Sequence, residues 1–203
     1  MKIITLALVL LSSAMAATIT LTMDEVAGQP INGLTVSKGG ESFTFSNPLG
    51  NLSYNSSGPG ALTFVQDPSI QGTPTPFGIA FAIPVYSIRF GLAENIFLPV
   101  MGIAKVEMFF NNVLPFATLT FNSSLVDPVA EGQFNFSGGP VSNILITPNV
   151  GPPALAFDNL TVNTIPEPST FAMLAGAAAL AAVRSFRSRR VCMVGCISPH
   201  ARC

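Results

Sequence analysis

Residues 17–165, the central part of the chain, contain no cysteine, no histidine and no tryptophan. Without cysteine this part has no disulfide, and without histidine it lacks the base of Ser-His and Cys-His nucleophilic sites. Zinc, which prefers nitrogen and sulfur ligands, has no ligand set there. Tryptophan, a common stacking platform for sugars, is missing as well. These absences argue against an enzyme and predict no cofactor.

Positive charge is equally scarce in this part of the chain. Three basic residues (Lys38, Arg89 and Lys105) stand against nine acidic ones, a net charge of 3 − 9 = −6. Nucleic acid is therefore not an expected partner, because its binding depends on neutralising phosphates with lysine and arginine. Few charges with much Ser, Thr, Asn, Gly and Pro are typical of an extracellular surface.

Long apolar runs occur only near the two ends, and the first has the organisation of a signal peptide. Met1-Lys2 is a basic start, Ile3 to Leu11 is apolar, and Ala14-Met15-Ala16 is an A-x-A cleavage site. The mature chain would then begin at Ala17, with residues 1–16 removed. The alternative is a hydrophobic N-terminal strand or anchor, but the run is too short to span a bilayer.

The second apolar run belongs to a three-part segment near the C-terminus. Two prolines around one carboxylate hold the backbone extended, and an uncharged run from 171 to 183 follows. Sixteen residues separate Glu167 from Arg184, about 24 Å as a helix, against a hydrocarbon core of about 30 Å. The arginines mark the cytoplasmic side. The motif is Pro166, Glu167, Pro168, Ser169 and Thr170, and the basic cluster is Arg184, Arg187, Arg189 and Arg190.

This order of parts, over roughly residues 165–190, resembles the PEP-CTERM sorting signal of bacterial exported proteins. The resemblance implies a membrane protease called an exosortase as a processing partner, beside the signal peptidase expected from the A-x-A site. It also implies a transient membrane anchor through residues 168–186 and delivery to the cell surface or extracellular matrix. The alternative is an ordinary single-pass C-terminal anchor. No Leu-Pro-x-Thr-Gly precedes the helix, and a GPI signal would not end in arginines.

Residues 191–203 depart from that pattern, because members of the family usually stop soon after the basic cluster. All three cysteines and the only histidine lie here, at Cys192, Cys196, His200 and Cys203. The spacing would suit four zinc ligands, but thirteen residues with a Gly and a Pro offer no supporting fold. Palmitoylation of a membrane-proximal cysteine is another alternative. We favour a frame error or run-on past the natural end.

Residues 17–164 show strand after strand with no sustained helical periodicity. About ten short strands with Gly, Pro and Asn turns predict an all-β fold, an antiparallel β-sandwich or jelly roll. Lys38-Gly39-Gly40 predicts a hairpin, and residues 106–110 and 117–121 should pair antiparallel. Residues 51–60 and 67–76 are expected to be loops, with a short strand between them around Leu62 and Phe64.

Two further expectations concern strand breaks. Pro84 should separate two paired strands, 78–83 and 86–92, and another two are expected around Phe134 and over 141–146. The apolar phase changes within residues 155–162, which predicts a bulge at Asp158-Asn159. The stretch 156–162 is also similar to the last strand of many PEP-CTERM ectodomains with galactose-binding-like sandwiches.

Three functions remain open for this ectodomain. The first is a structural or interaction role in the envelope or matrix without catalysis. The alternative is a carbohydrate-binding module for extracellular polysaccharide, with Tyr54 and Tyr86 as stacking rings. The second alternative is a glycoside hydrolase using two of the acidic residues. Separately, Asp67, Asp127 or Asp158 would be calcium ligands if loop carbonyls joined them. The acidic residues are Asp24, Glu25, Glu41, Asp67, Glu94, Glu107, Asp127, Glu131 and Asp158.

Five N-x-[ST] triplets are also present. In a bacterial secretory route they would stay bare, whereas a eukaryotic route would decorate them with glycans. They begin at Asn51, Asn55, Asn122, Asn135 and Asn159.

Overall fold

The computed structural model describes residues 17–26, 28–56, 58–96, 100–111, 114–126, 129–149 and 154–164. Within these ranges the chain is all-β, and every strand pair is antiparallel. No helix in them has the length and apolar character that crossing a membrane requires. Residues 1–16, 165–190 and 191–203, which carry the signal-peptide, sorting and tail interpretations, lie outside the described residues.

The strands in chain order are β1 (Ala17–Leu21), β2 (Gln29–Pro30), β3 (Thr35–Lys38), β4 (Glu41–Ser46), β5 (Ser53–Ser56), β6 (Ser69–Gly72), β7 (Phe77–Glu94), β8 (Ala104–Phe109), β9 (Pro115–Phe121), β10 (Ser124–Val126), β11 (Val129–Pro148) and β12 (Leu155–Thr164).

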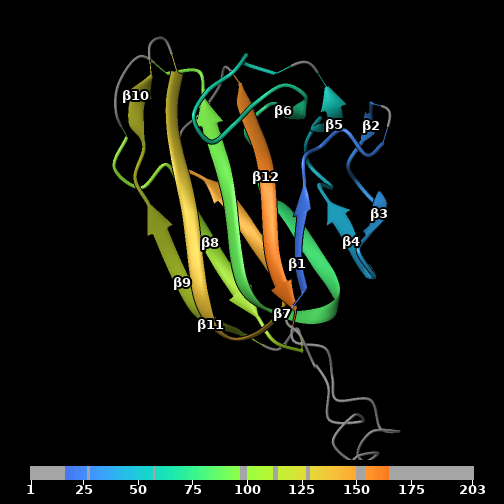
Figure 1. Cartoon of the computed structure of the whole chain (residues 1–203). Coiled ribbons are helices and arrows are strands. Elements are labelled where there is room, and N and C mark those ends of the chain that lie inside the picture. The colour runs from blue at the N-terminus through green and yellow to red at the C-terminus, as the bar shows by residue number, and fades with distance from the viewer. Residues whose placement is uncertain are drawn as a thin grey trace, which may run out of the picture. The chain divides into compact units, whose positions relative to one another are not determined.

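Two long strands, β7 and β11, organise these strands into layers. Their halves Val85–Glu94 and 130–141 pair with each other and with β12 and β10. Their other halves pair with each other again, and there β4 and β8 flank them. Between the halves the register shifts near Pro84 and Gly138-Gly139. Both strands therefore bend from one layer into the other at the lower end of Figure 1.

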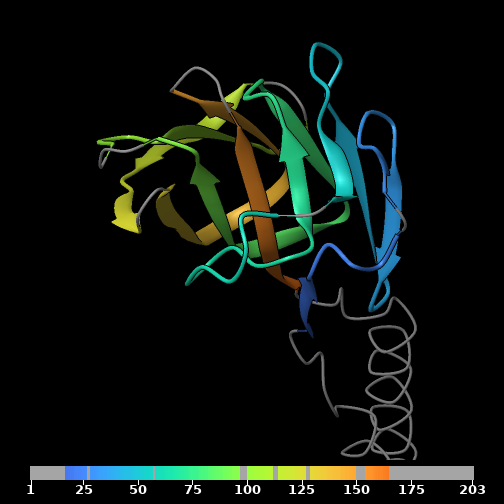
Figure 2. The same cartoon turned by 90° about the horizontal axis from the view of Figure 1, so that it is seen from above.

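The hydrophobic core lies between the two layers. Side chains alternate along each strand, so Ile88, Phe90 and Leu92 of β7 are all buried while Arg89 points outward. Phe90 is central: its ring stacks on Phe134 at 4.9 Å and lies 5.0 Å from Phe157. Residues 19–162 supply this entire core cluster. Figure 2 shows the strands arranged around this core. Residues 17–165, called the body below, therefore carry their own folding core.

Several expectations from the sequence are confirmed. In the hairpin, Val36 of β3 is paired with Phe43 of β4, and Gly39 and Gly40 occupy positive φ of 62° and 85° in the turn. The antiparallel pair of β8 and β9 is present, with Val106 opposite Leu119. The bulge is confirmed too: the register shifts between Asp158 and Thr161.

Other expectations are wrong. The residues expected to be loops contain β5 and β6, in which the side chains of Tyr54 and Ile70 are buried. The Ser and Gly residues around them made the strand pattern hard to recognise in the sequence. Around Leu62 and Phe64 the structure has no strand.

The two strands expected around Pro84 form one bent strand. The bend frees the N–H groups of Ala82 and Ile83, which donate to the Glu41 carboxylate at 2.6 and 3.1 Å. Proline is tolerated there because the ladder is interrupted at the bend, so its missing N–H leaves no ladder hydrogen bond unmade. In the same way, residues 134–136 and 141–146 belong to one strand, β11.

Candidate functional site

A shallow groove lies on the outward face of β1, β12, β7 and β11. Its volume is about 550 Å³, within the ~300–1,000 Å³ that ligand sites usually have. Seven of its nine lining residues carry hydroxyl, amide or guanidinium groups, and the other two are Ile88 and Phe136. The polar lining residues are Thr18, Ser87, Arg89, Asn135, Ser137, Thr161 and Asn163.

Strand register places these groups in rows across the sheet. Arg89 of β7 is opposite Thr161 of β12 on one side and Asn135 of β11 on the other. One step along the same face, Ser87 is opposite Asn163 and Ser137. The residues between these rows, such as Val162, point into the core. The alternation that buries one face of these strands thus gathers polar groups on the other face.

Hydrogen bonds hold part of the groove in place. The Thr18 hydroxyl donates to the side-chain amide oxygen Oδ1 of Asn163 at 2.7 Å, and the hydroxyls of Thr20 and Thr161 lie 2.9 Å apart. These contacts couple β1 to β12 along one rim. Arg89 is exposed and forms no ion pair within the described part of the chain. Its guanidinium is therefore available to a ligand.

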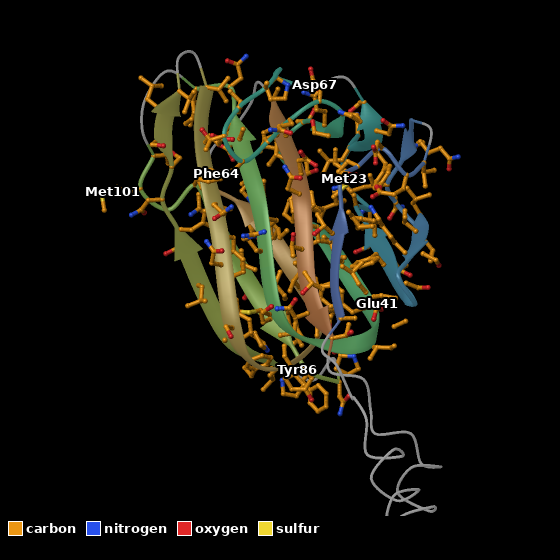
Figure 3. All side chains as sticks on the ribbon, viewed as in Figure 1. Met23, Glu41, Phe64, Asp67, Tyr86 and Met101 are labelled. Carbon is orange, nitrogen blue, oxygen red and sulfur yellow. The ribbon has the colours of Figure 1, made fainter. Side chains whose placement is uncertain are left out.

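The upper end of the same outward face is closed by residues 62–67. Glu131 accepts hydrogen bonds from the backbone N–H groups of Thr63, Phe64 and Val65, the last at 2.8 Å. Gly91 lies directly beneath, and a Cβ there would stand 2.2 Å from the Phe64 carbonyl oxygen. Figure 3 shows Phe64 over the upper part of this face. The loop therefore covers the part of this face around Gly91, beyond the residues that line the groove.

Asp158 fastens the next residue of that loop. Its Oδ2 accepts from the Gln66 N–H at 3.0 Å, and Asn159 at the bulge donates to the Phe64 carbonyl at 3.1 Å. Burial raises the pKa of Asp158 to about 6, against the lowering effect of its backbone hydrogen bonds. The bulge predicted from the sequence therefore has a structural purpose, because it turns both side chains toward the loop.

The other acidic residues considered for catalysis or calcium are dispersed. Glu41 binds backbone amides at the strand bend, and Asp67 accepts from the Gly60 N–H at 3.3 Å. Glu107 pairs with Lys105 at 3.1 Å. Asp127 lies outside the described residues. Among the residues described, no three metal-ligating side chains come together.

Tyr54 was expected to be a stacking ring, and this expectation is wrong. Its ring is fully buried, edge-on to Phe45 with centroids 5.7 Å apart. Its hydroxyl donates to Glu25, which also binds Lys38 at 2.7 Å. Burial acts to raise the Glu25 pKa, but these hydrogen bonds outweigh it and lower the pKa to about 2. Burial, followed by the Glu25 contact, raises the pKa of Tyr54.

Tyr86 is half-buried at the lower end of the fold and does not line the groove. Of the residues assigned to processing, Ala17 opens β1 opposite Thr164. The remaining ones, Ala14, Ala16, residues 166–170 and the four arginines, lie outside the described residues.

The groove was not predicted from the sequence. Arg89 was considered there only for its charge, and Asn135 only as the first residue of an N-x-[ST] triplet. The available signal was the polar phase Gln133, Asn135 and Ser137 between buried or half-buried phenylalanines. What was missing was the pairing of β7 with β11 and β12, because register between distant strands is set by tertiary packing.

No protein-family model and no curated protein matches the chain. Among solved structures it is similar to variants of a family 29 carbohydrate-binding module. A tyrosine-to-alanine variant has 10% identity and a TM-score of 0.41, over 73% of this chain and 93% of that one. An aspartate-to-alanine variant in complex with mannohexaose has 10% identity and a TM-score of 0.40, over 74% and 93%. At such values the chain is not assigned to that family.

Proposed function

We propose that residues 17–164 form a non-catalytic carbohydrate-binding module that holds a saccharide in the outward groove of β1, β12, β7 and β11. The observation that carries this proposal is the row of hydrogen-bonding side chains from three adjacent strands, Thr161, Arg89 and Asn135. Sugars present hydroxyl groups that both donate and accept, and hydroxyl and amide side chains match both roles.

The groove chemistry favours binding over hydrolysis. None of its nine lining residues is Asp or Glu, whereas a glycosidase needs two carboxyl groups on either side of the scissile bond. Glu131 and Asp158, on the same face, are buried, and they hold the loop formed by residues 62–67 in place.

A glycan array probed with residues 17–165 tests the proposal. The wild-type fragment should bind one class of polysaccharide, and Asn135→Ala and Asn163→Ala should weaken that binding. Thr118→Ala on β9, exposed in the other layer, is the matched control and should bind as wild type. Binding equally reduced by Thr118→Ala, or no binding to any glycan, would count against the groove.

We further propose that the chain is exported and sorted by an exosortase to the cell surface or matrix. The A-x-A site before Ala17, the Pro-Glu-Pro motif at 166–168 and the arginine cluster support this proposal. Expression with and without a cognate exosortase should change the mass and location of the protein. An unchanged, full-length membrane protein under both conditions would refute the sorting proposal. A structural role in the envelope without a glycan ligand would agree with sorting but give a blank array.

A further inference from the structure

Arg89 differs from the other two cations of the described residues. Lys38 is paired with Glu25 at 2.7 Å and Lys105 with Glu107 at 3.1 Å. Arg89 has no such partner within those residues, and it lies exposed in the middle strand of the groove. An arginine kept unpaired at the centre of a polar site is suited to an anionic group of the ligand.

The surroundings of Arg89 leave its charge uncompensated. Thr161 and Asn135, its direct neighbours across the sheet, are neutral, and no carboxylate lines the groove. The two acids of this face, Glu131 and Asp158, are buried and accept backbone N–H groups from the overlying loop. Their charge is thus directed at the loop instead of at the guanidinium.

A guanidinium presents a planar fork of N–H donors that fits a carboxylate with two parallel hydrogen bonds. We propose that the ligand is an acidic polysaccharide whose uronate carboxylate binds Arg89. This inference rests on the saccharide site proposed above. Neighbouring hydroxyls of the sugar then bond to Asn135 and Thr161 on either side.

The negative net charge of the body argues against non-specific binding of polyanions. With three basic and nine acidic residues between 17 and 165, the body as a whole repels polyanions, so general electrostatic attraction would not produce uronate binding. Attachment of a polyanion needs a local site, and the groove contains the one cation without a salt bridge in the described ranges.

Titration of residues 17–165 with oligogalacturonate and with its methyl ester, which lacks the negative charge, tests the inference. Wild type should prefer the acid by about tenfold or more. Arg89→Gln should bind acid and ester equally, while Arg89→Lys should keep part of the preference because a point charge remains. Lys105→Gln is the control, removing one half-buried cation from the other layer, and should behave as wild type.

The failures of the two proposals are distinguishable. An equal acid preference in wild type and Arg89→Gln, or binding of neutral glycans only, overturns the assignment of an acidic ligand and leaves the saccharide site standing. Absence of binding to acid, ester and every neutral glycan overturns both. Since Arg89 is exposed, a thermal melt of each variant should match wild type, and a lower melting temperature would contradict the position assigned to it.

Discussion

Glu94 near the end of β7 should make the stability of the body depend on pH. Its side chain follows Leu92 on the core-facing side and is only 2% exposed, with Ala130 and Leu155 as its neighbours across the sheet. Neither carboxylate oxygen has a hydrogen-bond partner within the described residues. Burial therefore raises the pKa of Glu94 from 4.5 to about 7.

The sign and size of the effect follow from this pKa. Because the folded state binds the proton more tightly than the unfolded state, the contribution of Glu94 to stability is fully present below pH 4.5 and is lost as the pH rises through 7. The difference corresponds to about 3 kcal/mol of unfolding free energy. Asp158, raised from 3.8 to about 6, contributes in the same direction, so the Glu94 share must be isolated by substitution.

Glu94→Gln provides that isolation. It replaces the carboxyl by a neutral group of the same shape, so the variant should be more stable than wild type at pH 8 by up to about 3 kcal/mol. Near pH 4.5 the two proteins should be close in stability. Urea unfolding of residues 17–165 at pH 4.5, 6, 7 and 8 measures this difference. A constant difference between the two proteins across that range would refute the reasoning.

Three further variants, one of them with a matched control, test other contacts. Gly91→Ala should lower stability by about 1–3 kcal/mol, because the new Cβ meets the Phe64 carbonyl at 2.2 Å. Gly139→Ala, with nothing within 4 Å, should match wild type in the same urea titration. Glu131→Ala should cost about 3 kcal/mol and speed hydrogen exchange at Val65, whereas unchanged exchange would contradict its anchoring role. Lys38→Gln removes a contact that lowers the Glu25 pKa, so it should lessen the loss of stability from pH 4.5 to 2 seen by circular dichroism; a loss as large as in wild type would contradict this contact.

Local patterns allowed part of the fold to be predicted. Gly39-Gly40 between alternating strands specified the β3–β4 hairpin, and the phase change near Asp158 specified the bulge in β12. Each of these features depends on residues close together in the chain, where turn chemistry and alternation decide the outcome.

The remainder depended on contacts between distant segments. β5 and β6 are short and rich in polar residues, and they form strands because β5 pairs with β6 and β6 pairs with β12. Pro84 suggested a strand break, but the buried Glu41 carboxylate satisfies the backbone at that bend. The groove was hidden for the same reason, since it exists only once β12, β7 and β11 are in register.

Amide chemical shifts of ¹⁵N-labelled residues 17–165 during titration with oligogalacturonate test the central claim most directly. The saccharide site predicts that perturbations concentrate at Ser87, Arg89, Asn135, Thr161 and Asn163, on the outward face of β7, β11 and β12. Amides of β8 and β9, in the other layer, should stay unchanged. Shifts concentrated on β8 and β9, or no shifts with this and every neutral oligosaccharide tried, would contradict the claim.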